Sequence, residues 1–95
     1  MYSNEHTLQQ LLKQAYRRLD MDNTAREVEV VHTYNVVVGD FISRLTQKVR
    51  YNEGMLTVQL ASAALKQELA YRRTSLADKI NETLGYPAVK KIVFL

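Results

Sequence analysis

The sequence predicts an α+β domain in which a three-stranded mixed sheet has its helices packed on one face. Three observations predict this class: helical apolar spacing in the N-terminal half, a short glycine-containing loop between two extended segments, and a β-branched segment after a long helical pattern. The 95 residues suffice for one domain. We expect it to span residues 1–95, with a helical part at 4–45 and a hairpin, a long helix and a last strand within 46–95.

The N-terminal part is predicted to hold two helices. Residues 4–19 carry apolar side chains at helical spacing, namely Leu8, Leu11, Leu12, Ala15, Tyr16 and Leu19. Residues 24–27 have the form of a capping box, so a second helix is expected to start there. The six valines within 28–38 suit a strand as well as a helix, and we interpret this segment as a helix that ends at Gly39. A short helical turn at 41–45 follows.

The C-terminal half shows clearer local signals. Residues 48–51 and 55–62 flank a three-residue loop that ends in Gly54, which predicts a β-hairpin. Residues 63–84 have apolar side chains at helical spacing and predict one long helix, and residues 89–95 predict a last strand. The expected order is α-α-β-β-α-β. Because strand–helix–strand units favour a right-handed crossover, we expect the last strand to lie parallel to its neighbour in the hairpin.

The sequence contains no catalytic or metal-binding pattern. It has no cysteine, and neither His6 nor His32 has a second histidine at metal-ligand spacing. Its three glycines are isolated, so no glycine-rich phosphate loop is present. No apolar run approaches the roughly 18 residues that a membrane span needs. We therefore expect a cytoplasmic, non-enzymatic protein with no cofactor, no metal, no small-molecule substrate and no membrane contact.

Basic residues gather in the C-terminal half. Residues 1–43 hold four basic and six acidic side chains, whereas residues 44–95 hold nine basic and four acidic ones. A basic surface attracts polyanions because binding releases their counterions. The alternative is that these side chains form an ordinary solvated surface, and the sequence leaves both interpretations open.

An ordered set of short motifs runs from residue 34 to residue 94. It comprises Tyr34, Val37-Val38-Gly39, Thr46, Gly54-Met55-Leu56-Thr57-Val58, Ser62, Leu65, Glu68-Leu69, Ile80-Asn81, Leu84-Gly85 and Ile92-Val93-Phe94. With these motifs the chain resembles the DciA-like family, which is linked to loading or operating the bacterial replicative helicase. The resemblance implies a K-homology-like fold and binding to both the replicative helicase and DNA.

Two features depart from the family pattern. The chain has no tryptophan, and Tyr34 and Leu65 stand at aromatic positions where many relatives carry it. Whether this changes the partner surface stays open. K-homology domains clamp single-stranded nucleic acid with a G-x-x-G loop between helices, and this chain has none. Any binding of nucleic acid is therefore expected to be electrostatic and weakly sequence-specific.

Basic and apolar residues of the C-terminal half are the candidates for binding surfaces. Strand alternation puts Arg50, Lys91, Val93 and Leu95 on the sheet face away from the helices. The other candidates lie along the predicted long helix, which carries an arginine pair. The candidate nucleic-acid residues are Arg50, Lys66, Arg72, Arg73, Lys79 and Lys91. The candidate partner residues are Tyr71, Val93 and Leu95. The structural alternatives are a solvated face and an ion pair between Arg73 and acids on its own helix.

The leading hypothesis is a helicase-associated replication factor that contacts DNA through its basic C-terminal half. One alternative is a protein-interaction module without affinity for nucleic acid, which would use the sheet edge or the first helix. The other alternative is an RNA-binding domain.

Overall fold

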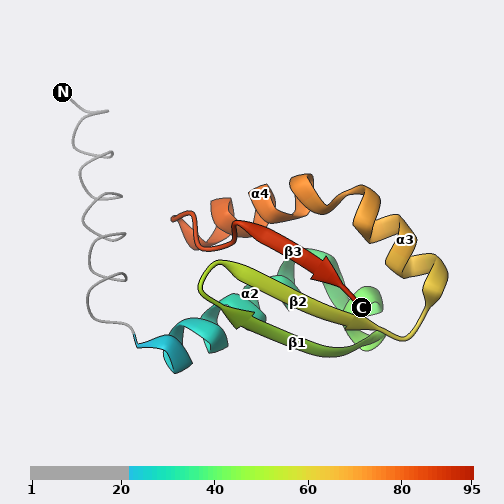
Figure 1. Cartoon of the computed structure of the whole chain (residues 1–95), viewed down its shortest axis with the longest axis horizontal. Helices are drawn as coiled ribbons and strands as arrows, with labels where there is room; N and C mark the ends of the chain where they lie inside the picture. Colours follow the sequence, from blue (N-terminus) through green and yellow to red (C-terminus); the bar gives the residue numbers. More distant parts are fainter. Residues whose placement is uncertain (1–21) are drawn as a thin grey trace.

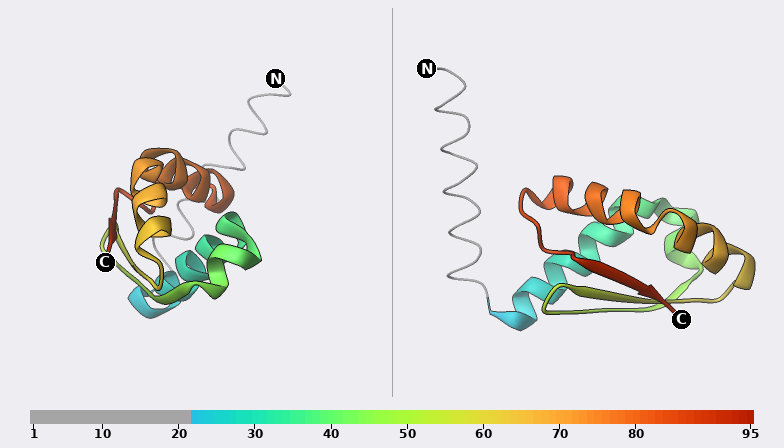
Figure 2. Two further views of the ribbon diagram at one scale, coloured as in Figure 1. Left: turned by 90° about the vertical axis from the view of Figure 1, so that its right-hand side faces the viewer. Right: turned by 45° about the horizontal axis from the view of Figure 1, so that its top comes forward.

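The three strands form one sheet, and the helices cover one of its faces (Figures 1 and 2). The computed structural model describes residues 22–95, so the helix predicted at 4–19 lies outside the described residues. The elements in chain order are α2 (Asn23–Arg44), β1 (Thr46–Asn52), β2 (Met55–Leu60), α3 (Ala63–Tyr71), α4 (Arg73–Leu84) and β3 (Lys91–Phe94). The predicted α+β class with a three-stranded mixed sheet is confirmed.

The sheet has the order β1-β2-β3, with β2 in the middle. β1 and β2 pair antiparallel as the predicted hairpin, and β2 and β3 pair parallel, with Leu56 opposite Ile92. The parallel last strand is therefore confirmed. Its predicted bounds of 89–95 are wrong at the start, because the backbone of Val89 is hydrogen-bonded to the side chain of Asn81 and not to β2. β2 also ends before Ser62, whose side chain caps α3.

The hairpin closes through a two-residue turn made by Glu53 and Gly54. Both residues have positive φ, 45° and 89°, which is the signature of a type I′ turn and matches the twist of the flanking strands. A Cβ atom added at Gly54 would lie 3.1 Å from a side-chain carbon of Lys90. The carbonyl oxygen of Gly54 also accepts the backbone N–H groups of Lys90 and Lys91, so the turn helps to position β3.

Gly54→Ala should lower the free energy of unfolding by about 1–2 kcal/mol, because an L-residue is strained in the left-handed region. The contact with Lys90 adds to this strain, since a Cβ would meet its side chain. The matched variant Glu53→Asn should raise stability, because asparagine is favoured at the first position of this turn. Urea unfolding followed by circular dichroism measures both. Equal unfolding midpoints for Gly54→Ala and the unaltered protein would contradict the assigned turn.

The valine-rich segment is helical, as predicted, and Gly39 interrupts it with φ 87° and ψ 172°. The predicted capping residue is wrong: the N-cap is Asp22, whose carboxylate accepts the backbone N–H of Ala25 at 2.7 Å. A carboxylate at this position also interacts favourably with the helix dipole. Glu27, the last residue of the supposed capping box, instead reaches across to β1.

The single long helix predicted at 63–84 is also wrong, because the structure breaks it at Arg72. This residue has φ −106° and ψ 18°, and its N–H donates to the carbonyl of Leu69 in a tight turn. The break allows α3 to pack on β2 and β3, while α4 packs on α2 and β3. Neither glycine nor proline occurs at this point, so packing of the two halves on different partners causes the bend.

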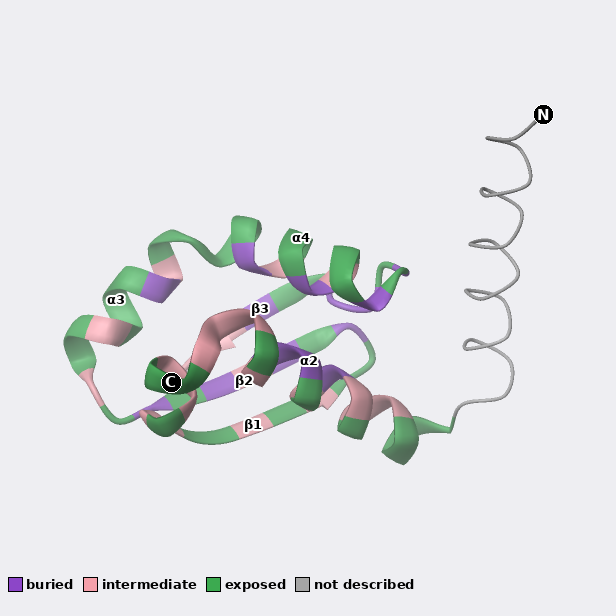
Figure 3. Cartoon of the chain, turned by 180° about the vertical axis from the view of Figure 1, so that it is seen from behind, coloured by how far each residue is buried: buried purple, intermediate pink, exposed green. Residues whose placement is uncertain are grey.

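The core lies between the inner face of the sheet and the buried stripes of α2 and α4 (Figure 3). Its fully buried large side chains are Tyr34, Leu56, Ile80, Ile92, Val30 and Val58. The hydroxyl of Tyr34 is hydrogen-bonded to that of Thr46 at 3.0 Å, and Leu65 packs against the core from α3. Burial raises the pKa of Tyr34. The residue at the family's aromatic position 34 therefore fills the core and does not form the surface.

Candidate nucleic-acid and partner surfaces

The structure divides the predicted site residues between two surfaces. Arg50, Lys91, Val93 and Leu95 lie on or next to the strands, on the sheet face that the helices leave uncovered. The other candidates are carried by α3, α4 and the residue that joins them, namely Lys66, Tyr71, Arg72, Arg73 and Lys79. The basic C-terminal half is therefore not one continuous basic surface.

The outer sheet face is defined here by Lys48, Arg50, Thr57, Gln59, Lys91, Val93 and Leu95. Strand register places Lys48 opposite Gln59, Arg50 opposite Thr57, and Thr57 opposite Val93. None of the three strands contains aspartate or glutamate, so the charged side chains of this face are all basic. Lys48 was missed by the sequence reasoning, although the alternation that selected Arg50 places Lys48 on the same face.

A shallow hollow of about 170 Å³ lies in the outer sheet face. It is lined by Lys48, Arg50, Thr57, Gln59 and Leu95. The lining therefore combines two cations, a hydroxyl, an amide and one apolar side chain. Such a surface can bind a phosphate backbone through charge and hydrogen bonds, while the apolar part contacts a sugar or a base.

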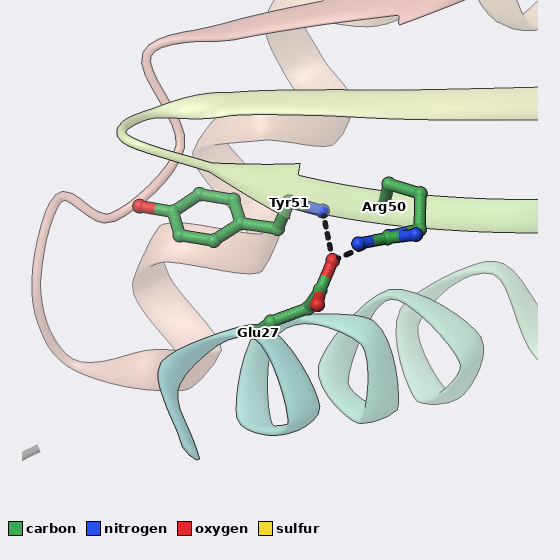
Figure 4. Close-up of polar contacts among 3 residues, drawn as sticks. All are labelled: Glu27, Arg50 and Tyr51. Atoms are coloured by element: carbon green, nitrogen blue, oxygen red, sulfur yellow. Dashed lines mark hydrogen bonds and ion pairs between the residues drawn. The ribbon is translucent and has the colours of Figure 1, made fainter. Parts of the chain in front are cut away.

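Glu27 fixes the position of Arg50 (Figure 4). One carboxylate oxygen, Oε2, accepts both the Nε–H of Arg50 and the backbone N–H of Tyr51, each at 2.9 Å. The hydrogen bond from Tyr51 and the guanidinium of Arg50 lower the pKa of Glu27. Because β1 is at the edge of the sheet, this carboxylate occupies a backbone donor that no neighbouring strand uses.

The segment before β3 is held by side chains from two other elements. The Nδ2 of Asn81 on α4 donates to the carbonyl of Val89 at 2.9 Å, and the N–H of Val89 donates to Asn81 Oδ1 at 2.8 Å. The hydroxyl of Tyr51 on β1 donates to the carbonyl of Ala88 at 2.6 Å. These bonds set the start of β3 and hence the place of Lys91 on the outer sheet face.

Tyr86 ties the same segment to α2. Its hydroxyl is hydrogen-bonded to Glu29 at 3.0 Å, and the guanidinium carbon of Arg26 lies 5.8 Å from its ring centroid. Burial and the hydrogen bond to Glu29 raise the pKa of Tyr86 to about 12. The raised pKa means that this contact stabilises the fold below pH 10 and is lost as the pH rises towards 12.

The cations near the α3–α4 junction have local contacts. Arg72 forms an ion pair with Glu68 on the preceding turn at 3.1 Å, whereas the structural alternative considered from the sequence was an ion pair of Arg73. Arg73 Nε donates to the carbonyl of Ala70 at 3.1 Å. Both side chains of the ion pair are more than half exposed, so the pair contributes little to stability and can be exchanged for another anion. Tyr71 is 92% exposed beside them.

Two further observations concern residues 22–95 only. No helix among them is long and apolar enough to cross a membrane. Within the same residues, no group of three or more His, Cys, Asp or Glu side chains is placed to hold a metal ion.

The order α-β-β-α-α-β of the described elements and the three-stranded mixed sheet define an α+β domain, and they are compatible with the K-homology-like fold that the resemblance implies. Arg72 alone joins α3 and α4, so the G-x-x-G loop that clamps nucleic acid in K-homology domains has no counterpart there. The model of the family described as Dna[CI] antecedent, DciA, matches residues 6–94, and the chain belongs to that family.

Membership gives the protein a role related to loading of the replicative helicase, and the family is not a known family of enzymes. No curated protein matches the sequence.

Proposed function

We propose that the protein is a helicase-associated replication factor that binds DNA on its outer sheet face. The observation that carries the DNA part is a face with the cations Lys48, Arg50 and Lys91 and no acidic residue in any strand; Lys48 and Arg50 line a hollow, and Arg50 is held by Glu27 of α2. Family membership supports the helicase part. Since the contacts are to phosphates, binding is expected to be strongly salt-dependent and weakly sequence-specific.

The outer sheet face is favoured over the α3–α4 junction for two reasons. Arg72 and Arg73 each have a local partner, whereas Lys48 and Lys91 are exposed on strands that lack acidic residues. The junction also lacks the loop with which K-homology domains clamp a strand. Lys66 on α3 and Lys79 on α4 lie outside the outer sheet face and are not part of this proposed DNA site.

Two double variants that remove the same charge separate these surfaces. Lys48→Ala plus Lys91→Ala should weaken DNA binding on the order of 100-fold at about 50 mM salt and reduce the salt slope by about 2. Arg72→Ala plus Arg73→Ala, the matched control, should change affinity much less. Fluorescence anisotropy with labelled single- and double-stranded DNA over a salt series measures both. Equal losses of DNA affinity in the two double variants would show that only net charge matters. A larger loss in Arg72→Ala plus Arg73→Ala would place the DNA site at the α3–α4 junction.

The protein partner is proposed to be the bacterial replicative helicase, with Tyr71 as a contact residue. Val93 and Leu95, the other two candidates, lie on the outer sheet face that is proposed for DNA. Affinity capture from the native cell extract should recover the helicase. A captured fraction that does not contain the helicase would contradict the proposed helicase partner. A gel shift at low salt tests the remaining alternatives: the absence of a shift at micromolar protein would favour a pure protein-interaction module, and a preference for RNA would favour an RNA-binding domain.

A further inference from the structure

A groove lies within the helical layer, between α2 and the segment formed by α3 and α4, and we call it the α2–α4 groove. Its volume is about 240 Å³. Apolar side chains make up its floor and walls, namely Val37, Val38, Ile42, Leu69 and Leu76, and the remaining lining residues are Arg72, Ser75 and Lys79. None of these residues belongs to the outer sheet face, so the groove is separate from the proposed DNA site.

Three large apolar side chains that are next to lining residues in the sequence are exposed. Val36 is 60%, Phe41 73% and Tyr71 92% exposed, and each is the direct sequence neighbour of a lining residue. A contiguous exposed apolar surface marks a site of macromolecular contact, and the apolar lining of the groove is such a surface. The groove itself is smaller than the about 300–1,000 Å³ of pockets that enclose drug-sized ligands. It suits one or two apolar anchor side chains of a larger partner.

The walls of the groove determine what kind of backbone can enter it. They come from helices and the residue that joins α3 and α4, and they contain no sheet edge with which an extended segment could pair. An extended segment in this groove would bury backbone N–H and C=O groups without a hydrogen-bond partner, which is unfavourable. A helix satisfies its own backbone groups, so a helix can enter at no such cost.

The charge of the groove determines which charged residues should flank the apolar stripe of that helix. Arg72 and Lys79 are the charged residues of the lining, and both are cations. The ion pair of Arg72 with Glu68 is exposed and can be replaced by a pair with an incoming carboxylate. We propose that the α2–α4 groove binds an amphipathic helix of a protein partner, whose apolar stripe is flanked by aspartate or glutamate.

The test uses two synthetic helical peptides with the same leucine stripe, one flanked by glutamates and one by lysines. The full-length protein should bind the glutamate peptide at least about tenfold more tightly, because like charges opposite each other are unfavourable. NMR shifts should concentrate at Val38, Leu69 and Leu76. The double variant Arg72→Glu plus Lys79→Glu should reverse the preference, and the matched variant Lys48→Glu plus Lys91→Glu should keep it.

Four results would overturn the proposal. The first is that the protein binds both peptides equally or binds neither. The second is that the NMR shifts fall outside the groove. The third is a set of groove shifts caused by an oligonucleotide and not by the glutamate peptide, which would make the groove a nucleic-acid site. The fourth is self-association of the protein that Arg72→Glu plus Lys79→Glu abolishes. This result would show that the groove holds a second copy of this chain. None of these results depends on Lys48 or Lys91, so the proposed DNA site is tested separately.

Discussion

Tyr34→Ala should lower the free energy of unfolding by about 3–5 kcal/mol, which is the usual cost of removing a large buried aromatic side chain. Tyr34 is fully buried at the centre of the core, where α2 faces the sheet. Domains of this size have only about 5–15 kcal/mol of stability, so the variant is expected to be close to unfolding at room temperature. The melting temperature should fall by roughly 12 °C or more.

The conservative variant Tyr34→Phe isolates the hydroxyl. It removes the hydrogen bond to Thr46 while keeping the ring, and it should cost only about 0.5–1.5 kcal/mol. Calorimetry of both variants therefore separates packing from hydrogen bonding. A melting temperature for Tyr34→Ala within a few degrees of the unaltered protein would contradict the central place of this ring in the core.

Asn81→Ala should lower the free energy of unfolding by about 2–4 kcal/mol, because it leaves both backbone groups of Val89 without their partners. Val89 is 3% exposed, so water cannot easily replace the lost bonds. The effect should also be local: amide hydrogen exchange at Val89 is expected to accelerate more than global unfolding predicts. Because this contact sets the start of β3, the variant should also weaken DNA binding through Lys91.

Two controls accompany Asn81→Ala. Asn81→Asp keeps an acceptor for the N–H of Val89 but loses the donor to its carbonyl, so it should retain only part of the stability. Glu82→Ala changes the exposed neighbour on the same helix and should be nearly neutral. If Asn81→Ala proves as mild as Glu82→Ala, the contact with Val89 does not contribute to the fold.

The parts of the fold that were predictable have local signals. The positive φ required at Gly54 and the extended segments on either side of it indicate the hairpin, and the crossover rule gives the parallel β3. The break at Arg72 has no such signal. Leu69 and Leu76 are seven residues apart, which is the spacing of one face of a continuous helix, so the apolar pattern gives no sign of the break. The break results from tertiary packing, because α3 packs on β2 and β3 whereas α4 packs on α2 and β3.

The capping residue shows a second limit of sequence reasoning. Asp22 and Thr24 are both good N-cap residues, and their choice shifts the helix start by only two residues. Glu27 fits the capping-box pattern, but it contacts Tyr51, which is 24 residues away in the sequence. A local sequence pattern contains no information about such a competing partner far away in the sequence.

The candidate site was predictable only in part. Strand alternation correctly placed Arg50 and Lys91 on one face, and the same rule would have added Lys48. The charge count along the chain grouped these residues with Arg72 and Arg73, which the structure places on the helices. A count by sequence position cannot separate two sides of a sheet. The apolar groove was not predictable, because α2 and α4 that form it are far apart in the sequence.

The carboxylate of Glu27 has a consequence for how the protein behaves at high concentration. An edge strand with a free amide can recruit the strand of another molecule and start an ordered aggregate. Here an anion already holds that amide, and the hydrogen bond from Tyr51 and the pairing with Arg50, which lower the pKa of Glu27, favour its ionised form. At Tyr51 an added strand would first have to displace a charged group, which disfavours fibre formation along this part of β1.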